Sequence, residues 1–363
     1  MSTATATEPT QELVRVTRTE LLQQLESVSP GITASPLVEQ SSCFVFRNGR
    51  VFTFNDEVAC KAKTSLPPTL EAAVSAQPLL NLLRKMEDDV VKVGVFGGVF
   101  HVRGKGTRSR SGITTEKTIL LPIQTVEKPT EWKELPPDFT EAVTIVQECA
   151  GKDESQFVIT CIHIHPKWLE ACDRFQLTRY RVATGFSKPT FIRRDSLRHV
   201  LGLDMTHFAE TEKWIHFKNP TGLVLSVRQY TEDMNYPSVG QWLKTSDGAK
   251  ATVLPKGLGG AADKAEIFSS ETKEKNYLLV SVKDNVIQVR GQGDSGFHEE
   301  EKPIIYTGAP IQFTIAPKLL IELTKRYVEC EISPDRLRVD GGKFVYVTTV
   351  GRVEMNDVKA GGG

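Results

Sequence analysis

Apolar positions along this chain recur with two different periods, and the change from one period to the other occurs three times. Leu79, Leu82, Leu83 and Met86 are spaced three or four residues apart, as on one face of a helix. Residues 91–95 then alternate apolar and small or polar side chains, which is typical of a half-buried strand. The pattern predicts a helix followed directly by a strand.

Two later segments repeat this order. A helical pattern begins at residues 194–196 and precedes a strand-like stretch at 214–217. Pro317, a residue favoured in the first turn of a helix, begins a third helical pattern before a strand at 328–332. The repeat period of roughly 120 residues exceeds the ~20–50 residues of solenoid units, so we predict three similar domains.

The domain boundaries are expected where these patterns are interrupted. Pro136-Pro137 ends the first pattern, and residues 244–260 lack apolar periodicity and read as a connector. We expect a disordered tail over residues 1–12, domains over 13–136, 137–246 and 247–354, and a flexible tail over 355–363. Further helices are predicted at 19–25, 139–149 and 261–268, strands at 42–46, 50–55, 157–165, 168–172, 278–282, 286–289 and 344–347, and hairpin turns at 48–49 and 283–285.

Composition narrows the class of protein without assigning a function. The 363 residues carry 45 basic and 45 acidic side chains, so net charge neither requires nor excludes a nucleic-acid partner. No run of eighteen apolar residues is present to span a membrane, and the first residues lack the order of a secretory signal. Six scattered cysteines without CxxC spacing favour buried thiols in a reducing compartment, so we expect a cytoplasmic protein.

One segment resembles a known family. Residues 169–177, Leu-Glu-Ala-Cys-Asp-Arg-Phe-Gln-Leu, resemble the Ala-Thr-Asp-Gly-His-Arg-Leu strand and turn of the bacterial DNA polymerase III beta subunit, the sliding clamp. Residues 51–67, 225–237 and 264–269 resemble further parts of that family in the same order, and the resemblance covers about residues 13–350. Arg174, Phe175 and Gln176 replace the usual glycine, histidine and arginine, and the family's C-terminal Met-Pro-Met-Arg-Leu has no counterpart. We therefore expect a divergent member, such as a phage- or plasmid-encoded one.

The resemblance implies an α+β fold of three clamp domains, each with two helices packed on antiparallel sheets. It further implies a head-to-tail homodimer that closes a six-domain ring around duplex DNA without reading its sequence. Polymerase and clamp-loader subunits would bind through short linear motifs, no enzymatic activity or cofactor is expected, and the ring would work in the bacterial cytoplasm or nucleoid, or in infected host cytoplasm.

The resemblance also implies two sets of site residues. The partner-binding cleft would comprise Ile159, Cys172, Arg174, Phe175, Gln176, Leu177, Pro237, Gln241, Trp242, Ala316 and Leu319. Ordinary core packing is the alternative for Leu177, Pro237 and Leu319, whereas an exposed Phe175 or Trp242 would indicate a docking surface. The DNA-contacting residues would be Arg18, Arg84, Lys85, Arg193, Arg194, Arg198, Lys325 and Arg326, which lie on or next to predicted helices; a solvated helix surface explains each one equally simply.

Other chemical signals are weaker. Cys161, His163 and His165 would share one face of a strand, but the spacing typical of structural zinc is absent, and we expect no metal. Residues 104–107 and 257–260 lack the spacing of phosphate-binding loops, and no catalytic motif is specific. The basic segment 103–110 is interpreted as a solvated hairpin tip rather than a contact to DNA or a neighbouring subunit.

Three functions therefore compete. A processivity clamp predicts a dimer that is retained on circular DNA and lost when that DNA is cut. A clamp-derived platform would bind peptide clients without encircling DNA, as the altered 174–176 triplet and the missing tail would allow. An unrelated enzyme with internal repeats would have to use the Cys161 face.

Overall fold

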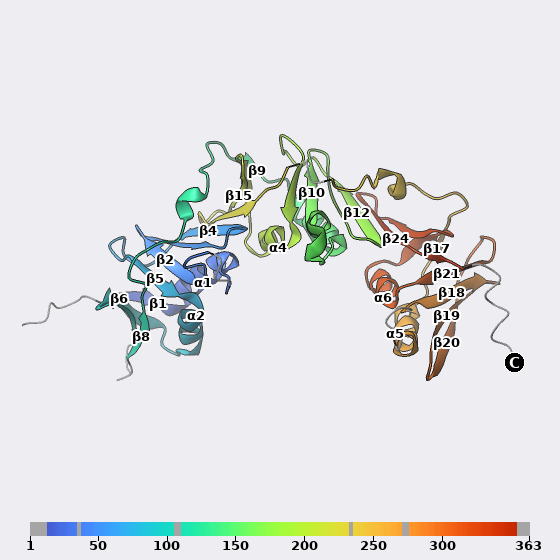
Figure 1. Ribbon diagram of the computed structural model, residues 1–363, viewed down its shortest axis with the longest axis horizontal. Helices are drawn as coiled ribbons and strands as arrows, with labels where there is room; N and C mark the ends of the chain where they lie inside the picture. Colours follow the sequence, from blue (N-terminus) through green and yellow to red (C-terminus); the bar gives the residue numbers. More distant parts are fainter. Residues whose placement is uncertain (1–12, 35–37, 105–109, 232–234, 271–275, 354–363) are drawn as a thin grey trace, which may run out of the picture. The chain divides into compact units, whose positions relative to one another are not determined.

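The computed structural model describes residues 13–34, 38–104, 110–231, 235–270 and 276–353 (Figure 1). The predicted tails and residues 105–109 of the basic segment lie outside this part of the chain. The α-helices are α1 (Arg18–Val28), α2 (Ala76–Lys85), α3 (Phe139–Val146), α4 (Arg194–Leu197), α5 (Leu258–Ser269) and α6 (Pro317–Arg326). None of these described helices is long and apolar enough to cross a membrane.

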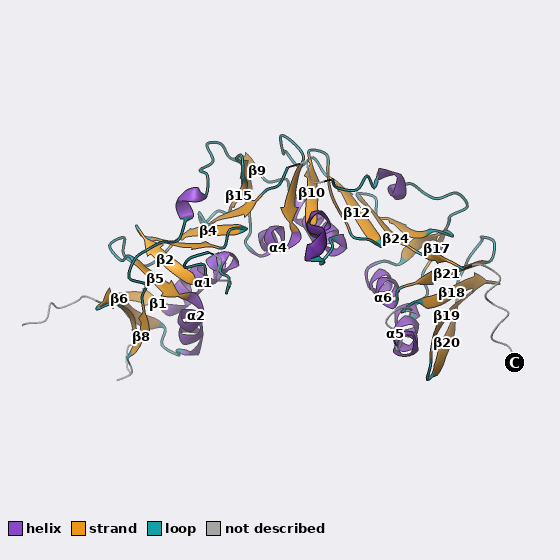
Figure 2. Ribbon diagram, viewed as in Figure 1, coloured by secondary structure: helices purple, strands orange, loops and turns teal. Residues whose placement is uncertain are grey.

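Strands make up most of the remaining regular structure (Figure 2). They are β1 (Val14–Thr17), β2 (Cys43–Arg47), β3 (Arg50–Phe54), β4 (Val58–Lys63), β5 (Ala72–Ser75), β6 (Val90–Phe96), β7 (Val99–Gly104), β8 (Ser111–Thr114), β9 (Lys133–Glu134), β10 (Cys161–His165), β11 (Trp168–Cys172), β12 (Gln176–Arg181), β13 (Thr190–Arg193), β14 (His207–Glu210), β15 (Trp214–Lys218), β16 (Val224–Arg228), β17 (Lys250–Val253), β18 (Leu278–Lys283), β19 (Val286–Gly293), β20 (Gly296–Pro303), β21 (Ile311–Ile315), β22 (Glu329–Ile332), β23 (Arg336–Asp340), β24 (Phe344–Thr349) and β25 (Gly351–Arg352).

The chain divides into two compact units. The described residues within Met1–Thr144 and Thr184–Glu232 form unit 1, and those within Ile145–Ala183 and Asp233–Gly363 form unit 2. Unit 1 contains the sheets β1-β6-β7-β8 and β5-β2-β3-β4-β16-β15-β14-β9. In unit 2, neighbouring strands run in the orders β10-β11-β12-β24-β23-β22-β17 and β20-β19-β18-β21-β25. The larger sheet of each unit joins strands from successive repeats, through β4–β16 in unit 1 and β12–β24 in unit 2.

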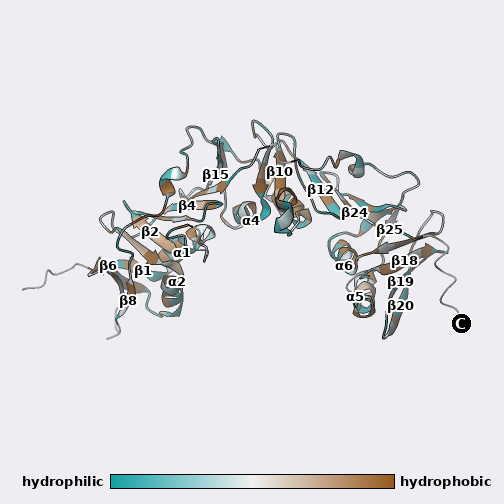
Figure 3. Ribbon diagram, viewed as in Figure 1, coloured by the Kyte–Doolittle hydropathy of each residue, from teal (hydrophilic) through white to brown (hydrophobic). Residues whose placement is uncertain are grey.

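The helices bury the apolar faces that the sequence pattern predicts. Leu21, Leu25 and Val28 follow one face of α1 and are fully buried where the helix packs against α2, β3 and β4. In unit 2, α5 packs on β19, β20 and α6. Strand β18 of this sheet is mainly apolar, whereas β20 at the sheet edge is mainly hydrophilic (Figure 3).

The predicted threefold order is confirmed. Strand, helix and strand follow one another as β5-α2-β6, β13-α4-β14 and β21-α6-β22. In the second copy, the strand predicted at 214–217 is β15, which follows the unpredicted β14. The hairpin turns are also confirmed, because Asn48 and Gly49 have φ of 53° and 68°, and Asp284 and Asn285 have φ of 52° and 60°. Positive φ at both central residues is what a tight hairpin of this handedness requires.

Several predicted elements are wrong in detail. The strand predicted at 157–165 begins only at Cys161, because residues 154–160 form a 3-10 helix. Asp153 accepts a hydrogen bond from the Ser155 amide at 3.0 Å and starts this helical turn. The presumed connector 244–260 contains β17, which pairs with β22, and α5 begins at Leu258. The second repeat's helix is only four residues long and continues as a 3-10 helix over 198–202.

Candidate functional site

The turn between β11 and β12 presents an aromatic side chain to solvent. Asp173 Oδ1 accepts hydrogen bonds from the backbone amides of Phe175 at 2.7 Å and Gln176 at 2.8 Å. This side-chain-to-backbone bonding fixes the turn locally. Phe175, within this turn, is 46% exposed. Arg174 beside it is also exposed and lies 3.6 Å from Asp153.

Strand β24 lies beside this turn although it is about 170 residues further along the chain. The Thr349 amide donates to the Phe175 carbonyl at 2.8 Å. The Tyr346 hydroxyl donates to Gln176 Oε1 at 3.1 Å. The turn is therefore held from both sides, and the sheet next to it carries side chains from the second and third repeats.

An apolar cluster of unit 2 lies beneath the turn. Its members are Ile159, Cys172, Leu177, Val239, Val345 and Val347, with Val158, Tyr236 and Leu243 partly buried against them. Cys172 is 2% exposed, and burial raises the pKa of its thiol to about 11, so the thiol stays protonated and acts as an apolar group. We call these nine residues the unit 2 cluster.

A second exposed aromatic residue lies on the segment that packs against this cluster. Trp242 belongs to a 3-10 helix over 240–243 and is 38% exposed. The Arg336 guanidinium lies 4.8 Å from the centre of its ring and donates to the Trp242 carbonyl at 2.8 Å. Asp335 accepts from Arg336, which lowers the pKa of that carboxyl to about 2. An ion-paired arginine thus holds the indole in place.

The eleven predicted cleft residues fall into distinct structural classes. Ile159, Cys172 and Leu177 are buried in the cluster, whereas Arg174, Phe175, Pro237, Gln241 and Trp242 are exposed and Gln176 is half-buried. Ala316 is the N-cap residue of α6 and Leu319 is half-buried in its first turn, and neither belongs to the cluster. The prediction missed Tyr236, Val239, Leu243, Val345 and Val347, although the alternation of β24 was a usable signal.

Basic residues end both α2 and α6. Arg84-Lys85 and Lys325-Arg326 occupy the last turns, where positive charge complements the helix dipole. Arg84 lies 2.8 Å from Glu26, and Lys325 and Arg326 pair with carboxylates of unit 2. The helix dipole therefore accounts for part of the recurrence of basic residues at the ends of these helices.

Arg18 has a structural role. Its Nε donates to the Asp88 carbonyl at 2.9 Å and its Nη1 to the Leu83 carbonyl at 3.1 Å. These bonds satisfy carbonyl groups at and just beyond the C-terminal end of α2, where the helix itself supplies no N–H donors. The first residue of α1 thereby holds α1 and α2 together.

The second repeat places three arginines around its short helix. Arg194 and Arg198 lie 2.9 Å and 3.5 Å from Asp195, whose carboxyl pKa is lowered chiefly by the bond from Arg194, against the opposing effect of burial. Arg193 lies 3.9 Å from Glu57. These arginines are therefore partly neutralised within unit 1.

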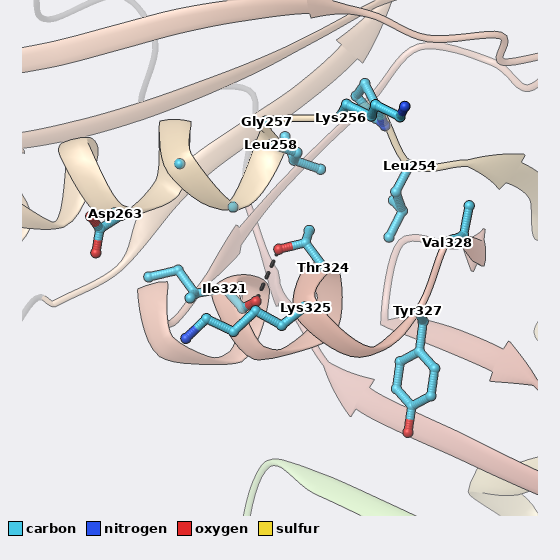
Figure 4. Close-up of a pocket in the computed structure, with 13 residues that line it drawn as sticks. Leu254, Lys256, Gly257, Leu258, Asp263, Ile321, Thr324, Lys325, Tyr327 and Val328 are labelled. Atoms are coloured by element: carbon cyan, nitrogen blue, oxygen red, sulfur yellow. Dashed lines mark hydrogen bonds between the residues drawn. The ribbon is translucent and has the colours of Figure 1, made fainter.

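A hollow of about 510 Å³ lies between the N-terminal end of α5 and α6 (Figure 4). Gly259 permits the close helix contact, because a Cβ there would lie 2.4 Å from Thr324 Oγ1. Lys256, Asp263 and Lys325 line the hollow, and the aliphatic part of Lys325 runs along α6 in the close-up. The predicted DNA-contacting lysine of α6 is thus next to a concave surface.

On the strand face that carries Cys161, His163 and His165, where no metal was expected, both histidines pack against aromatic rings. His163 lies edge-on to Trp168 and Tyr236, with ring centres 4.7 Å and 5.1 Å apart, and His165 stacks on Trp168 at 4.6 Å. Burial lowers the pKa of His163 to about 4, so it is neutral at pH 7. Across the described ranges, no group of three or more His, Cys, Asp or Glu side chains is placed to hold a metal ion.

Comparison with solved structures identifies the fold. A putative DNA polymerase III beta subunit from Eubacterium rectale superposes with a TM-score of 0.79 at 15% identity, covering 94% of this chain and 100% of its own. The beta subunit from Thermotoga maritima gives 0.79 at 17% identity with the same coverage. The chain has the sliding-clamp fold. A Pseudomonas aeruginosa sliding clamp bound to griselimycin gives 0.78 at 14% identity, again over 94% of this chain and 100% of its own.

The clamp fold confirms the predicted fold class and the resemblance on which it was based. No protein-family model matches the sequence, and neither does any curated protein. Identities of 14–17% in these three structures fit a divergent sequence that keeps the three-domain clamp architecture.

Proposed function

We propose that this protein is a DNA sliding clamp that encircles duplex DNA as a homodimer and tethers a polymerase and other clients. The observation that carries the proposal is the clamp fold over 94% of the chain. A topological ring holds DNA without base contacts, so its inner surface needs only diffuse positive charge. Such a protein needs no catalytic group, and we infer a non-enzymatic role in the cytoplasm.

The unit 2 cluster supports a docking role. Phe175 and Trp242 are exposed, and each is close in sequence to a member of the cluster, Leu177 and Leu243 respectively. Exposed aromatic residues near buried apolar side chains are typical of the centre of a peptide-binding site. Clients would be polymerase and clamp-loader subunits that insert an apolar side chain of a short linear motif between these rings. Arg174 and Arg336 beside these rings are already paired with Asp153 and Asp335, so this site adds little net positive charge and favours motifs with polar rather than acidic flanks.

Two open sheet edges support a head-to-tail dimer. Strand β8 ends one sheet of unit 1 and β20 ends one sheet of unit 2. Unpaired edges readily add a strand from another chain. Phe297 on β20 is 58% exposed and Ile267 on the adjacent α5 is 64% exposed, which gives the β20 edge an apolar border. We infer that β8 of one protomer pairs with β20 of its partner, which would close a ring after two contacts.

One observation favours the second candidate, a client-binding platform that does not encircle DNA. Seven of the eight predicted DNA-contacting residues already bond to carboxylates or carbonyls within the chain. Among the described residues, Lys85 makes no such bond. Phosphate contacts would have to share or replace these pairs, so DNA binding by the open chain should be weak and salt-sensitive.

The deciding experiment measures topology. Light scattering over a dilution series gives the oligomeric state. Protein diluted to monomer, mixed with nicked circular plasmid and reconcentrated would allow the ring to close around DNA without a loader. A clamp predicts a dimer that co-elutes with the circle at high salt and is released when a restriction enzyme linearises it. A persistent monomer, or equal loss from circle and line, would instead support the platform.

A further inference from the structure

The larger sheet of unit 1 repeats the strand order of the larger sheet in unit 2. Strands β2-β3-β4 continue into β16-β15-β14-β9, just as β10-β11-β12 continue into β24-β23-β22-β17. In unit 2, the segment before β17 packs on the sheet through Tyr236, Val239 and Leu243. In unit 1, the segment before β9 packs in the same way through Leu121, Ile123 and Val126. Each unit therefore has a surface formed by a sheet and an overlying connecting segment.

The surface of unit 1 contains a hollow of about 590 Å³. This volume lies within the ~300–1,000 Å³ typical of sites that hold small ligands, and it is enough for a short peptide segment. Phe52, Ile123 and Val126 give it an apolar side, and Arg50, Lys61 and Lys128 give it a basic side. All of these residues belong to unit 1.

The basic side carries charge that the described part of the chain leaves unneutralised. Arg50, Lys61 and Lys128 form no ion pair with any described carboxylate, whereas Arg47, which also lines the hollow, lies 3.6 Å from Glu71. Burial lowers the pKa of Lys61, and the neighbouring charges of Arg50 and Lys128 add to that effect. Three cations that repel one another around a concave surface would be stabilised by an anionic ligand.

Two further titratable groups of the hollow, Glu127 and His216, are already bonded. Glu127, the one carboxylate among its described lining residues, accepts from the Lys213 amide at 3.0 Å. His216 is 1% exposed and bonds to Ser226 at 2.7 Å, and burial lowers its pKa to about 4, so it adds no charge at pH 7. The net charge that a ligand meets there is positive.

Aromatic geometry distinguishes between two kinds of anionic ligand. Trp132 lines the hollow, but the Lys218 ammonium lies 4.4 Å from the centre of its ring. Phe52 packs against the apolar cluster of unit 1. Single-stranded nucleic acid binds chiefly by stacking its bases on open aromatic faces, and here one face of Trp132 is covered by Lys218 while Phe52 is partly buried. An acidic peptide with an apolar side chain matches both the basic and the apolar side.

We propose that this hollow is a second docking groove, specific for acidic peptide segments that carry an apolar residue between their carboxylates. The carboxylates would bind Arg50, Lys61 and Lys128, and the apolar side chain would lie against Phe52 and Val126. The groove lies wholly within unit 1, so it requires neither ring closure nor the unit 2 cluster. The groove proposal rests on the proposed function, but a binding experiment can refute the groove without bearing on ring closure, and the topology experiment can refute the clamp without bearing on the groove.

The test measures anisotropy of a fluorescein-labelled, end-blocked peptide, Gly-Asp-Leu-Asp-Phe-Glu-Gly, on the full chain. Its amide twin, Gly-Asn-Leu-Asn-Phe-Gln-Gly, reports the contribution of charge. The doubly substituted Lys61→Gln/Lys128→Gln protein removes two groove cations. A matched Lys117→Gln/Lys188→Gln protein removes two exposed lysines of unit 1 outside the groove. Phe175→Ala removes the aromatic of the other site.

The acidic peptide should bind more tightly than its amide twin, and the groove variant should weaken it about tenfold, from about threefold per charge. The matched variant and Phe175→Ala should leave its affinity unchanged. Equal affinity for the groove and matched variants, or for the two peptides, would overturn the proposal. So would a labelled (dT)12 that loses affinity in the groove variant while the acidic peptide does not bind, which would make the hollow a nucleic-acid site.

Discussion

Replacing Phe175 by alanine should abolish most client binding at the unit 2 cluster. A phenylalanine presents about 200 Å² when fully exposed. With 46% of the residue exposed, roughly 90 Å² remains for a partner to cover. At about 25 cal/mol per Å², this area corresponds to about 2 kcal/mol, or a loss of affinity of about 30- to 50-fold.

The same substitution also affects the fold, so the assay needs a control. The covered part of Phe175 contributes to stability by the same arithmetic, with an upper limit of about 3 kcal/mol. Tyr277 is 48% exposed in the same unit and lies outside the cluster. Tyr277→Ala should therefore lower the free energy of unfolding by a similar amount while leaving the site intact.

The probe is the tightest peptide selected from a random displayed library on the intact chain, and its affinity is measured by fluorescence anisotropy. The expected result is a large loss of affinity for Phe175→Ala and none for Tyr277→Ala. Equal affinity for Phe175→Ala and the unsubstituted protein would refute the reasoning, because the selected clients would then bind a different surface.

Three further predictions test other parts of the structure. Ile267→Asp should make the protein monomeric at micromolar concentration in light scattering. The control Ile305→Asp, at a position 84% exposed in the same unit, should leave the dimer intact. If both variants remained dimeric, the β20 interface would be contradicted. Arg179→Met leaves the 2% exposed Glu170 without its 2.6 Å ion pair, so the free energy of unfolding should fall by about 3–5 kcal/mol at pH 7.5. Burial raises the pKa of the Glu170 carboxyl, so the loss measured in urea titrations should become smaller as the pH is lowered from 7.5 and the carboxyl takes up a proton; a loss that does not change with pH would argue against a buried charge. Burial lowers the pKa of His216 from 6.5 to about 4, so as the pH falls the unfolded chain takes up a proton before the folded one does. The free energy of unfolding of unit 1 should therefore fall by about 3 kcal/mol between pH 6.5 and pH 4. In His216→Gln this dependence on pH should be flatter.

The repeat could be read from the sequence because it depends on local periodicity. The apolar spacing of α2 and α6 is set by residues within one helix, and the actual helices match it. The second copy matched less well, because α4 has only four residues before the 3-10 turn. Strand β17 was missed because its partner strand β22 is about 80 residues further along the chain and its own sequence, Lys-Ala-Thr-Val, has little periodicity.

The sites were only partly predictable, for a similar reason. Exposure of Phe175 and Trp242 could be expected from their place in a turn and a connecting segment. Charge pairing could not be predicted from the sequence, because partners such as Arg326 and Glu148 are separated by 178 positions in the chain. The groove of unit 1 was missed entirely, because Lys61 and Lys128 are far apart in sequence and neither carries a motif.

The interleaving of the two units constrains how the chain can fold during translation. Strand β12 ends at Arg181, and its partner β24 begins only at Phe344. At about 5–20 residues per second, the ribosome needs on the order of ten to thirty seconds to supply that partner. Throughout this interval β12 has an unpaired edge, while unit 1 can close as soon as β16 has emerged to pair with β4. Unit 2 is therefore the part of the nascent chain with the greater need for a chaperone.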